Sequence, residues 1–126
     1  MKPVMQTRFG IEGNCFAACV ASILEVPIDE VPWLKVSESW SDYQLRLNYY
    51  LKETHKIIII WCNYDWFKND YMESFKDSYY IVSGKIEGEL EHSVIYRNDK
   101  LIHDSNPKKN KIIGIDYIYL FVKIFK

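Results

Sequence analysis

The second half of the chain repeats short apolar segments between turn-forming residues, and this pattern predicts a mostly antiparallel β-sheet. β-branched and aromatic residues dominate five such segments, at 56–62, 79–84, 92–97, 100–104 and 117–125. The segment at 56–62 is uniformly apolar and is therefore expected to be covered on both faces. A further layer must pack against this sheet, and the first half of the chain is the source of that layer.

Helices are predicted in three segments, at 14–26, 40–53 and 66–75. Asn14 is the expected N-cap of the first helix, and Ser41 or Asp42 is the expected N-cap of the second. Prolines in the stretch at 27–32 end the first helix. The order of elements predicts an α+β fold in which the first helix packs on the sheet. A length of 126 residues suits one domain, 1–126.

Composition and charge exclude several classes of partner. The net charge is −1, and the local excess of lysine at 107–111 is interpreted as a solvated loop, not as a stripe that binds nucleic acid. The longest apolar run is too short to cross a bilayer, and the first ten residues lack the apolar core of a signal peptide. The cysteine count of three is odd, so reduced thiols in a cytoplasmic protein are expected. No cofactor is expected.

The segment "GNCFAAC" puts Cys15 directly after the expected N-cap, in the first turn of a helix. A thiol attacks only as the thiolate, and the unpaired N–H groups and the dipole of a helix start favour an anion. Cys19 lies one turn deeper and Cys62 ends an apolar strand, so both fit small buried hydrophobic residues. Cys15 is therefore the candidate nucleophile, and the alternative is that it also only fills the core.

A cysteine nucleophile needs a histidine as base and a third group that orients the imidazole. His92 opens one predicted strand and Asp104 ends the next, whereas His55 fits a helix C-terminus. His92 and Asp104 share a face only if the hairpin has an odd-length loop or a bulge, which is predicted within residues 97–101. A strict two-residue turn would place Asp104 opposite Ser93. Asn106 has the same parity as Asp104 and is the reserve candidate.

An early "GNCFAAC" helix, a later strand that opens with histidine and a following strand that ends in "HDSNP" resemble the compact papain-like cysteine peptidases. The closest subgroup is the double-glycine-leader peptidases of bacteriocin exporters, with their small bacterial and phage relatives. The resemblance implies a papain-like fold. It also implies that Cys15 is the nucleophile, that His92 is the base and that Asp104 orients the base.

The resemblance further implies that a glutamine upstream of the cysteine donates to the oxyanion, and Gln6 is the matching residue. Along the sequence, Gln6 lies farther from Cys15 than the corresponding glutamine of that family lies from its cysteine. The chain also has Asn14-Cys15-Phe16 where the family usually has Asp-Cys-Gly. The backbone N–H of Cys15 supplies one oxyanion donor in either case. Asn14 is the alternative to Gln6 as the second donor.

Three functions fit these residues. The first is a thiol-dependent hydrolase of peptide or amide bonds, acting on a peptide, protein or small amide through a thioester at Cys15. The second is an acyltransferase with the same triad. The third is a non-catalytic binding or inhibitory protein that keeps the papain-like scaffold, and small phage-borne proteins would fit this third function. A metal site of Cys15, Cys19, His92 and His103 is disfavoured, because Cys-x₃-Cys on one helix suits structural zinc poorly.

Overall fold

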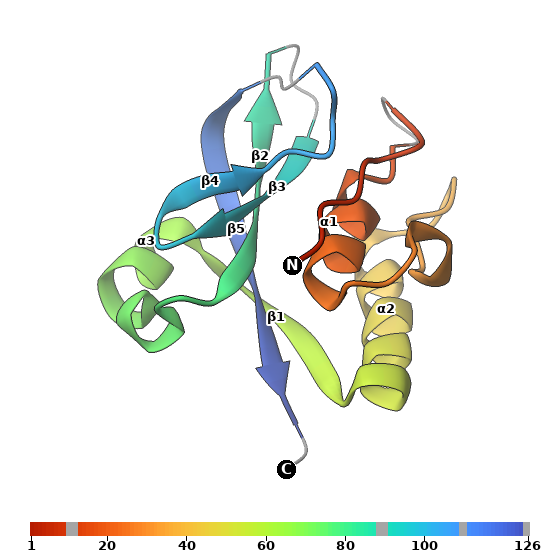
Figure 1. The fold of residues 1–126 in the computed structure, drawn as a ribbon, viewed down its shortest axis with the longest axis horizontal. Coiled ribbons are helices and arrows are strands. Elements are labelled where there is room, and N and C mark those ends of the chain that lie inside the picture. The colour runs from red at the N-terminus through yellow and green to blue at the C-terminus, as the bar shows by residue number, and fades with distance from the viewer. Residues whose placement is uncertain (10–12, 88–90, 109–110, 125–126) are drawn as a thin grey trace.

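A five-stranded antiparallel sheet with the strand order β1-β5-β2-β3-β4 forms the centre of the fold (Figure 1). The structure is a computed structural model that describes residues 1–9, 13–87, 91–108 and 111–124. The strands are β1 (Ile57–Asn63), β2 (Tyr79–Ile86), β3 (Glu91–Arg97), β4 (Lys100–His103) and β5 (Ile112–Lys123). The five predicted strands are confirmed, and β5 begins earlier than the predicted position 117. The last residue of the predicted strand, Phe125, and part of the predicted loop at 107–111 lie outside the described residues.

The helices are α1 (Cys15–Leu24), α2 (Trp40–His55) and α3 (Tyr64–Trp66), with short helical turns η2 (Ile28–Glu30), η3 (Phe67–Tyr71) and η4 (Glu73–Phe75). The segment predicted as a helix at 66–75 is helical but irregular, since α3 continues into a π-helical turn, η3, and a 3₁₀ turn, η4. Ser39 caps α2, because its hydroxyl accepts a hydrogen bond from the Asp42 backbone N–H at 3.1 Å. The prediction of Ser41 or Asp42 as the cap is wrong, since the helix already starts at Trp40. Of the described helices, none combines the length and the apolar character that crossing a bilayer requires.

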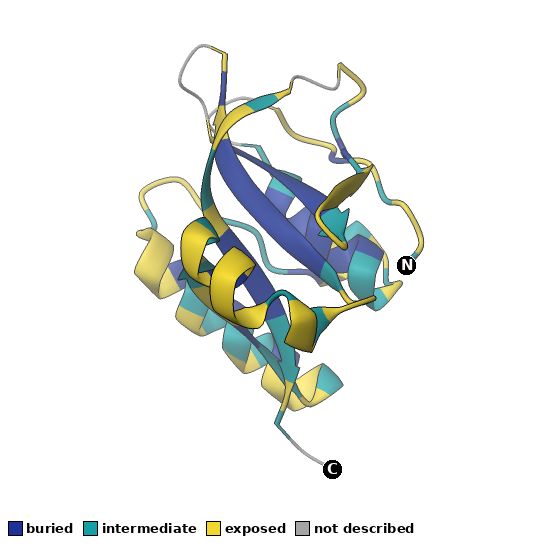
Figure 2. Cartoon of the chain, turned by 90° about the vertical axis from the view of Figure 1, so that its left-hand side faces the viewer, coloured by how far each residue is buried: buried dark blue, intermediate teal, exposed yellow. Residues whose placement is uncertain are grey.

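Helices and turns cover both faces of the sheet. α1 and α2 lie on one face, and the turns from α3 to η4 lie on the other (Figure 1). Because side chains alternate along a strand, Ile81 and Ile95 pack with α1 and α2, whereas Val82 and Val94 pack with Phe67. Figure 2 shows the central strands buried between these layers. The predicted α+β arrangement, with the first helix on an antiparallel sheet, is confirmed.

Strand β1 differs from its prediction. It lies at the edge of the sheet beside β5, and only Ile59 is buried along its length. Ile60 and Trp61 are 44% and 57% exposed. The prediction that this apolar segment is covered on both faces is therefore wrong, because an edge strand lacks a neighbour whose side chains would shield it.

The hairpin between β3 and β4 contains a bulge. Asn98 and Asp99 form a two-residue turn, and both have a positive φ, of 51° and 62°. Next to this turn Tyr96 pairs with Leu101, but one residue further along β3 the partner of Ile95 is His103, because β4 carries one extra residue. The predicted bulge is present, but it lies at Ile102, just beyond the predicted range 97–101, and the alternative of an odd-length loop is wrong.

Candidate active site

Cys15 is the first residue of α1, and it is only half-buried. Asn14 occupies the N-cap position, as predicted, but its side chain makes no capping hydrogen bond within the described residues. Its Oδ1 accepts from the backbone N–H groups of Thr7 and Arg8 at 3.0 Å, and its Nδ2 donates to Thr7 Oγ1 at 2.9 Å. The first turn of α1 also holds no acidic residue. No side chain of α1 therefore competes for the backbone N–H groups of this first turn, which can interact with a negative charge that approaches them.

His92 and Asp104 form a buried pair. Their exposed fractions are 4% and 9%, and 2.7 Å separates His92 Nε2 from Asp104 Oδ1. The bulge shifts the register so that His103 pairs with Ile95, and Asp104, the next residue after β4, then falls on the same face as His92. Asp104 Oδ1 also accepts from the Asn106 backbone N–H at 2.9 Å. The group that orients the imidazole is therefore Asp104, and the reserve candidate Asn106 supports Asp104 instead.

Gly84 allows the sheet to close tightly beside His92. β2 pairs Gly84 with His92 on one side and with Ile115 on the other, and its register to β5 shifts just before Gly84. A Cβ atom at Gly84 would overlap the carbonyl oxygen of Gly114. Any larger residue would therefore push β5 away from the strand pair that holds His92.

Burial and hydrogen bonds set the charges of this pair. Burial opposes protonation of His92, but hydrogen bonds and negative charge from Asp104 and Cys15 raise its pKa to about 9. Burial likewise favours the neutral form of Asp104. Hydrogen bonds from His92 and from the Asn106 backbone outweigh burial, and together with nearby histidine charge they hold the pKa of Asp104 below its ordinary value. The imidazolium–carboxylate form is therefore favoured at neutral pH.

Cys15 and His92 line a common pocket of about 490 Å³, the histidine pocket, whose wall also includes Gln6, Gly13, Glu91 and Asn106. Asp104 engages Nε2 of the imidazole, which leaves Nδ1 as the ring nitrogen for the thiol. A histidine with one nitrogen on a carboxylate and the other facing a cysteine can move a proton to and from sulfur.

Gln6 is buried and held by three hydrogen bonds. Its backbone N–H donates to Ser105 O at 3.1 Å, and its Oε1 accepts from Ser105 Oγ at 3.0 Å. Its Nε2 donates one hydrogen to Arg8 O at 2.9 Å, and the amide carries a second N–H. Because Gln6 lines the histidine pocket with Cys15, that N–H is a candidate oxyanion donor. The alternative donor, Asn14, likewise donates one amide hydrogen, to Thr7 Oγ1, but it is not part of the wall of the histidine pocket.

The segment 4–8 joins α1 to the end of β4. The Val4 N–H donates to Ser22 Oγ of α1 at 2.8 Å, and Val4 O lies 2.9 Å from His103 Nε2 of β4. With the bonds of Gln6 to the following serine, this segment fixes the helix that carries Cys15 relative to the hairpin that carries Asp104.

The remaining cysteines and His55 lie apart from this chemistry. Cys19 is fully buried one turn along α1, and burial raises the pKa of its thiol well above the ordinary value. Cys62 is half-buried in β1, where burial also raises the pKa. His55 ends α2, as predicted.

The alternative of a metal site gains no support from the geometry. His103 Nε2, one of the four candidate ligands, is placed against Val4 O. Throughout the part of the chain that the structure describes, no three histidine, cysteine, aspartate or glutamate side chains are grouped so that they could hold a metal ion.

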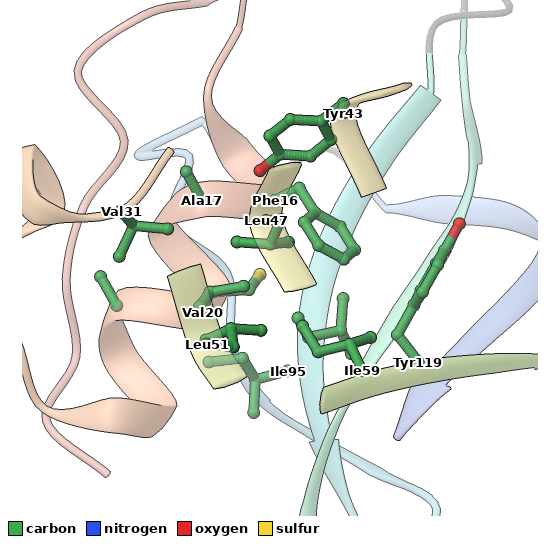
Figure 3. Packing of buried hydrophobic residues seen from close by; sticks show 13 residues of the cluster. Phe16, Ala17, Val20, Val31, Tyr43, Leu47, Leu51, Ile59, Ile95 and Tyr119 are labelled. Carbon is green, nitrogen blue, oxygen red and sulfur yellow. The ribbon is translucent and has the colours of Figure 1, made fainter. Parts of the chain in front are cut away.

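A second pocket on the other side of Cys15 was missed by sequence analysis. This aromatic pocket has a volume of about 270 Å³, and its wall includes Phe16, Trp33, Trp40, Tyr43, Tyr117 and Tyr119. Figure 3 shows Phe16 between Tyr43 and Tyr119 at the edge of the core. The signal in the sequence was the aromatic content of 16%, but the residues come from separate segments that no spacing rule connects.

Comparisons with known proteins complete the description of the site. No family model matches the chain, and neither the curated proteins nor the solved structures include a significant match. The papain-like resemblance therefore stays a prediction, and the chemistry of the site must be inferred from its geometry.

Proposed function

We propose that this protein is a thiol-dependent hydrolase of peptide or amide bonds, with Cys15 as nucleophile, His92 as base and Asp104 as the group that orients the base. The observation that carries this proposal is the buried 2.7 Å hydrogen bond between His92 and Asp104, in a pocket that Cys15 also lines. A buried charged pair costs desolvation, and such pairs are concentrated at sites where they do chemistry.

The reaction would start from a thiolate–imidazolium pair, in which the proton of the Cys15 thiol already resides on His92 Nδ1, as the raised pKa of His92 favours. The thiolate then attacks the carbonyl carbon, forming the S–C bond and moving an electron pair to the carbonyl oxygen. The Cys15 backbone N–H and Gln6 Nε2 would donate to that oxyanion. As the C–N bond breaks, His92 returns its proton to the leaving amine and a thioester remains on Cys15.

Hydrolysis of the thioester completes the cycle. His92 takes a proton from water, the hydroxide oxygen attacks the thioester carbon, and the S–C bond breaks. The carboxylic acid leaves, and the proton on His92 is available to restore the thiol. A reducing compartment such as the cytoplasm would keep the three cysteines as free thiols, the form in which they occur here.

The first test of this proposal is alkylation of the folded protein with iodoacetamide at pH 7, followed by peptide mass spectrometry. Cys15 should react faster than Cys62, which is similarly half-buried and serves as the internal control. His92→Ala should slow the reaction of Cys15 and leave that of Cys62 unchanged. Equal rates at Cys15 in the wild type and in His92→Ala would identify a non-catalytic scaffold.

A further inference from the structure

Two pockets meet at Cys15, and they differ in the groups they contain. Gly13, Cys15 and Glu91 line both, so the pockets adjoin at these residues. His92 and Gln6 line only the histidine pocket. The aromatic pocket therefore lacks the imidazole that, in the proposed reaction, protonates the leaving amine.

The proposed chemistry assigns opposite ends of a substrate to these pockets. The leaving amine must receive its proton from His92, so it must occupy the histidine pocket. The acyl group stays attached to Cys15 after the C–N bond breaks and must extend away from the departing amine. The aromatic pocket, which Cys15 lines and His92 does not, is the space available to the acyl group.

The walls of the aromatic pocket are close-packed rings. Phe16 makes edge-to-face contacts with Trp40, at 5.2 Å between ring centroids, and with Tyr119, at 4.8 Å. Trp40 also contacts Tyr43 at 5.1 Å. Such ring edges favour another aromatic group, which can join the same edge-to-face arrangement.

The volume of the pocket limits what it can hold. An apolar cavity of roughly 150 Å³ binds benzene, so about 270 Å³ accommodates one aromatic ring with the atoms that link it to a carbonyl group. Two buried hydroxyls also line the pocket, those of Ser83 and Ser93, and they lie 2.6 Å from each other. The exposed carboxyl side chain of Glu91 stands where the two pockets adjoin, which disfavours an acidic acyl group.

We propose that the aromatic pocket is the acyl-binding subsite and that it selects substrates whose acyl group carries a neutral aromatic side chain. This inference rests on the proposed function, because the polarity of the substrate follows from His92 as the proton donor to the leaving amine.

The test compares two chloromethyl ketones, those of N-acetylphenylalanine and N-acetylglycine, as probes of the folded protein. In each, the Cys15 thiolate displaces chloride and forms a thioether, and the rate is read from the intact mass. Rates are divided by the rate with iodoacetamide, which has no side chain to place in a pocket. The phenylalanine reagent should be faster by roughly tenfold or more, as expected for burial of one apolar ring.

Two tryptophan variants make the comparison specific to the pocket. Trp40→Ala removes part of the wall and should bring the ratio of the two rates close to one. Trp66→Ala is the matched control, since Trp66 is 60% exposed in α3, on the opposite face of the sheet. If thermal melting shows that Trp40→Ala does not fold, Tyr117→Ala replaces it, because Tyr117 is 44% exposed and lines the same pocket.

The possible failures can be told apart. Equal rates for the two ketones would overturn the subsite alone, provided that iodoacetamide still labels Cys15 in a manner that depends on His92. A faster glycine reagent, or a preference that both wall variants retain, would overturn the subsite as well. Iodoacetamide labelling of Cys15 that does not respond to His92→Ala would overturn the proposed function and this inference with it.

Discussion

The two sides of Cys15 are built by different kinds of interaction. On the side of the histidine pocket, directed hydrogen bonds hold His92, Asp104 and Gln6 in place. On the side of the aromatic pocket, edge-to-face ring contacts such as that of Phe16 with Trp40 make up most of the wall. The difference teaches that reactivity and selectivity are separable in this molecule. Changes on the histidine side should alter rates, and changes on the aromatic side should alter which reagent is preferred.

The largest expected effect follows from removal of the base. His92→Ala should lower kcat/KM for an N-acetylphenylalanine coumarin amide by roughly 10³-fold, because neither the thiol nor the leaving amine can then exchange a proton with the enzyme. His55→Ala, at the end of α2, is the matched control and should keep the wild-type rate. A comparable loss in both variants would place the effect in folding and not in catalysis.

The next effect concerns the oxyanion. Gln6→Ala should lower kcat roughly 10²-fold with a smaller change in KM, since the donor acts on charge that develops in the transition state. The control is Gln44→Ala in α2, which should leave both constants unchanged. A Gln6→Ala enzyme with altered KM and unchanged kcat would exclude Gln6 as an oxyanion donor.

A smaller effect is expected in the pH profile. The pKa of His92 is raised to about 9, so the imidazolium that protonates the leaving amine persists until the pH exceeds that value. The rate of amide hydrolysis should therefore fall above about pH 9. Asp104→Asn removes the carboxylate charge, lowers the pKa of His92 and should move this alkaline limb to lower pH. An unmoved limb would show that Asp104 does not control the proton of His92.

The smallest effect is on stability. The pKa of His92 rises from an ordinary value of 6.5 to about 9 on folding. Proton binding therefore stabilises the folded protein fully below pH 6.5, and this stabilisation is lost as the pH rises through about 9. Urea unfolding at pH 6 and pH 8.5 should show this decline in the wild type and a weaker one in His92→Gln. Identical declines in the two proteins would assign the dependence to other groups, such as the buried Cys19 thiol.

Local sequence patterns predicted which segments form helices and strands. They predicted less well which of these elements lie next to one another in the fold. The β-branched run at 56–62 predicted a strand, and β1 (Ile57–Asn63) is one. Its place at the edge of the sheet depends on β5, whose pairing with β1 joins segments far apart in the chain. A local pattern describes one segment at a time, so it could not show that Trp61 would be exposed.

The candidate site was predicted through residue types, but its geometry required the structure. Cys15, His92 and Asp104 were selected because a nucleophile, a base and an orienting group need those side chains. Whether His92 and Asp104 share a face depended on one extra residue in β4, and the apolar sequence of that strand is compatible with either register. The aromatic pocket was not foreseen, because its walls come from segments that only the tertiary fold brings together.

The contacts of the segment 4–8 have a consequence for the stage of synthesis at which the candidate site can form. His103 reaches Val4, and Ser105 reaches Gln6, across 99 residues of chain in each case. Contacts between such distant residues form late, because closing a long loop costs entropy that few early contacts repay. A chain still under synthesis therefore carries Cys15 long before it carries a working site. Nascent chains that end at Asn98 should show no dependence of Cys15 labelling on His92, and that dependence should emerge only in chains that extend beyond Ser105.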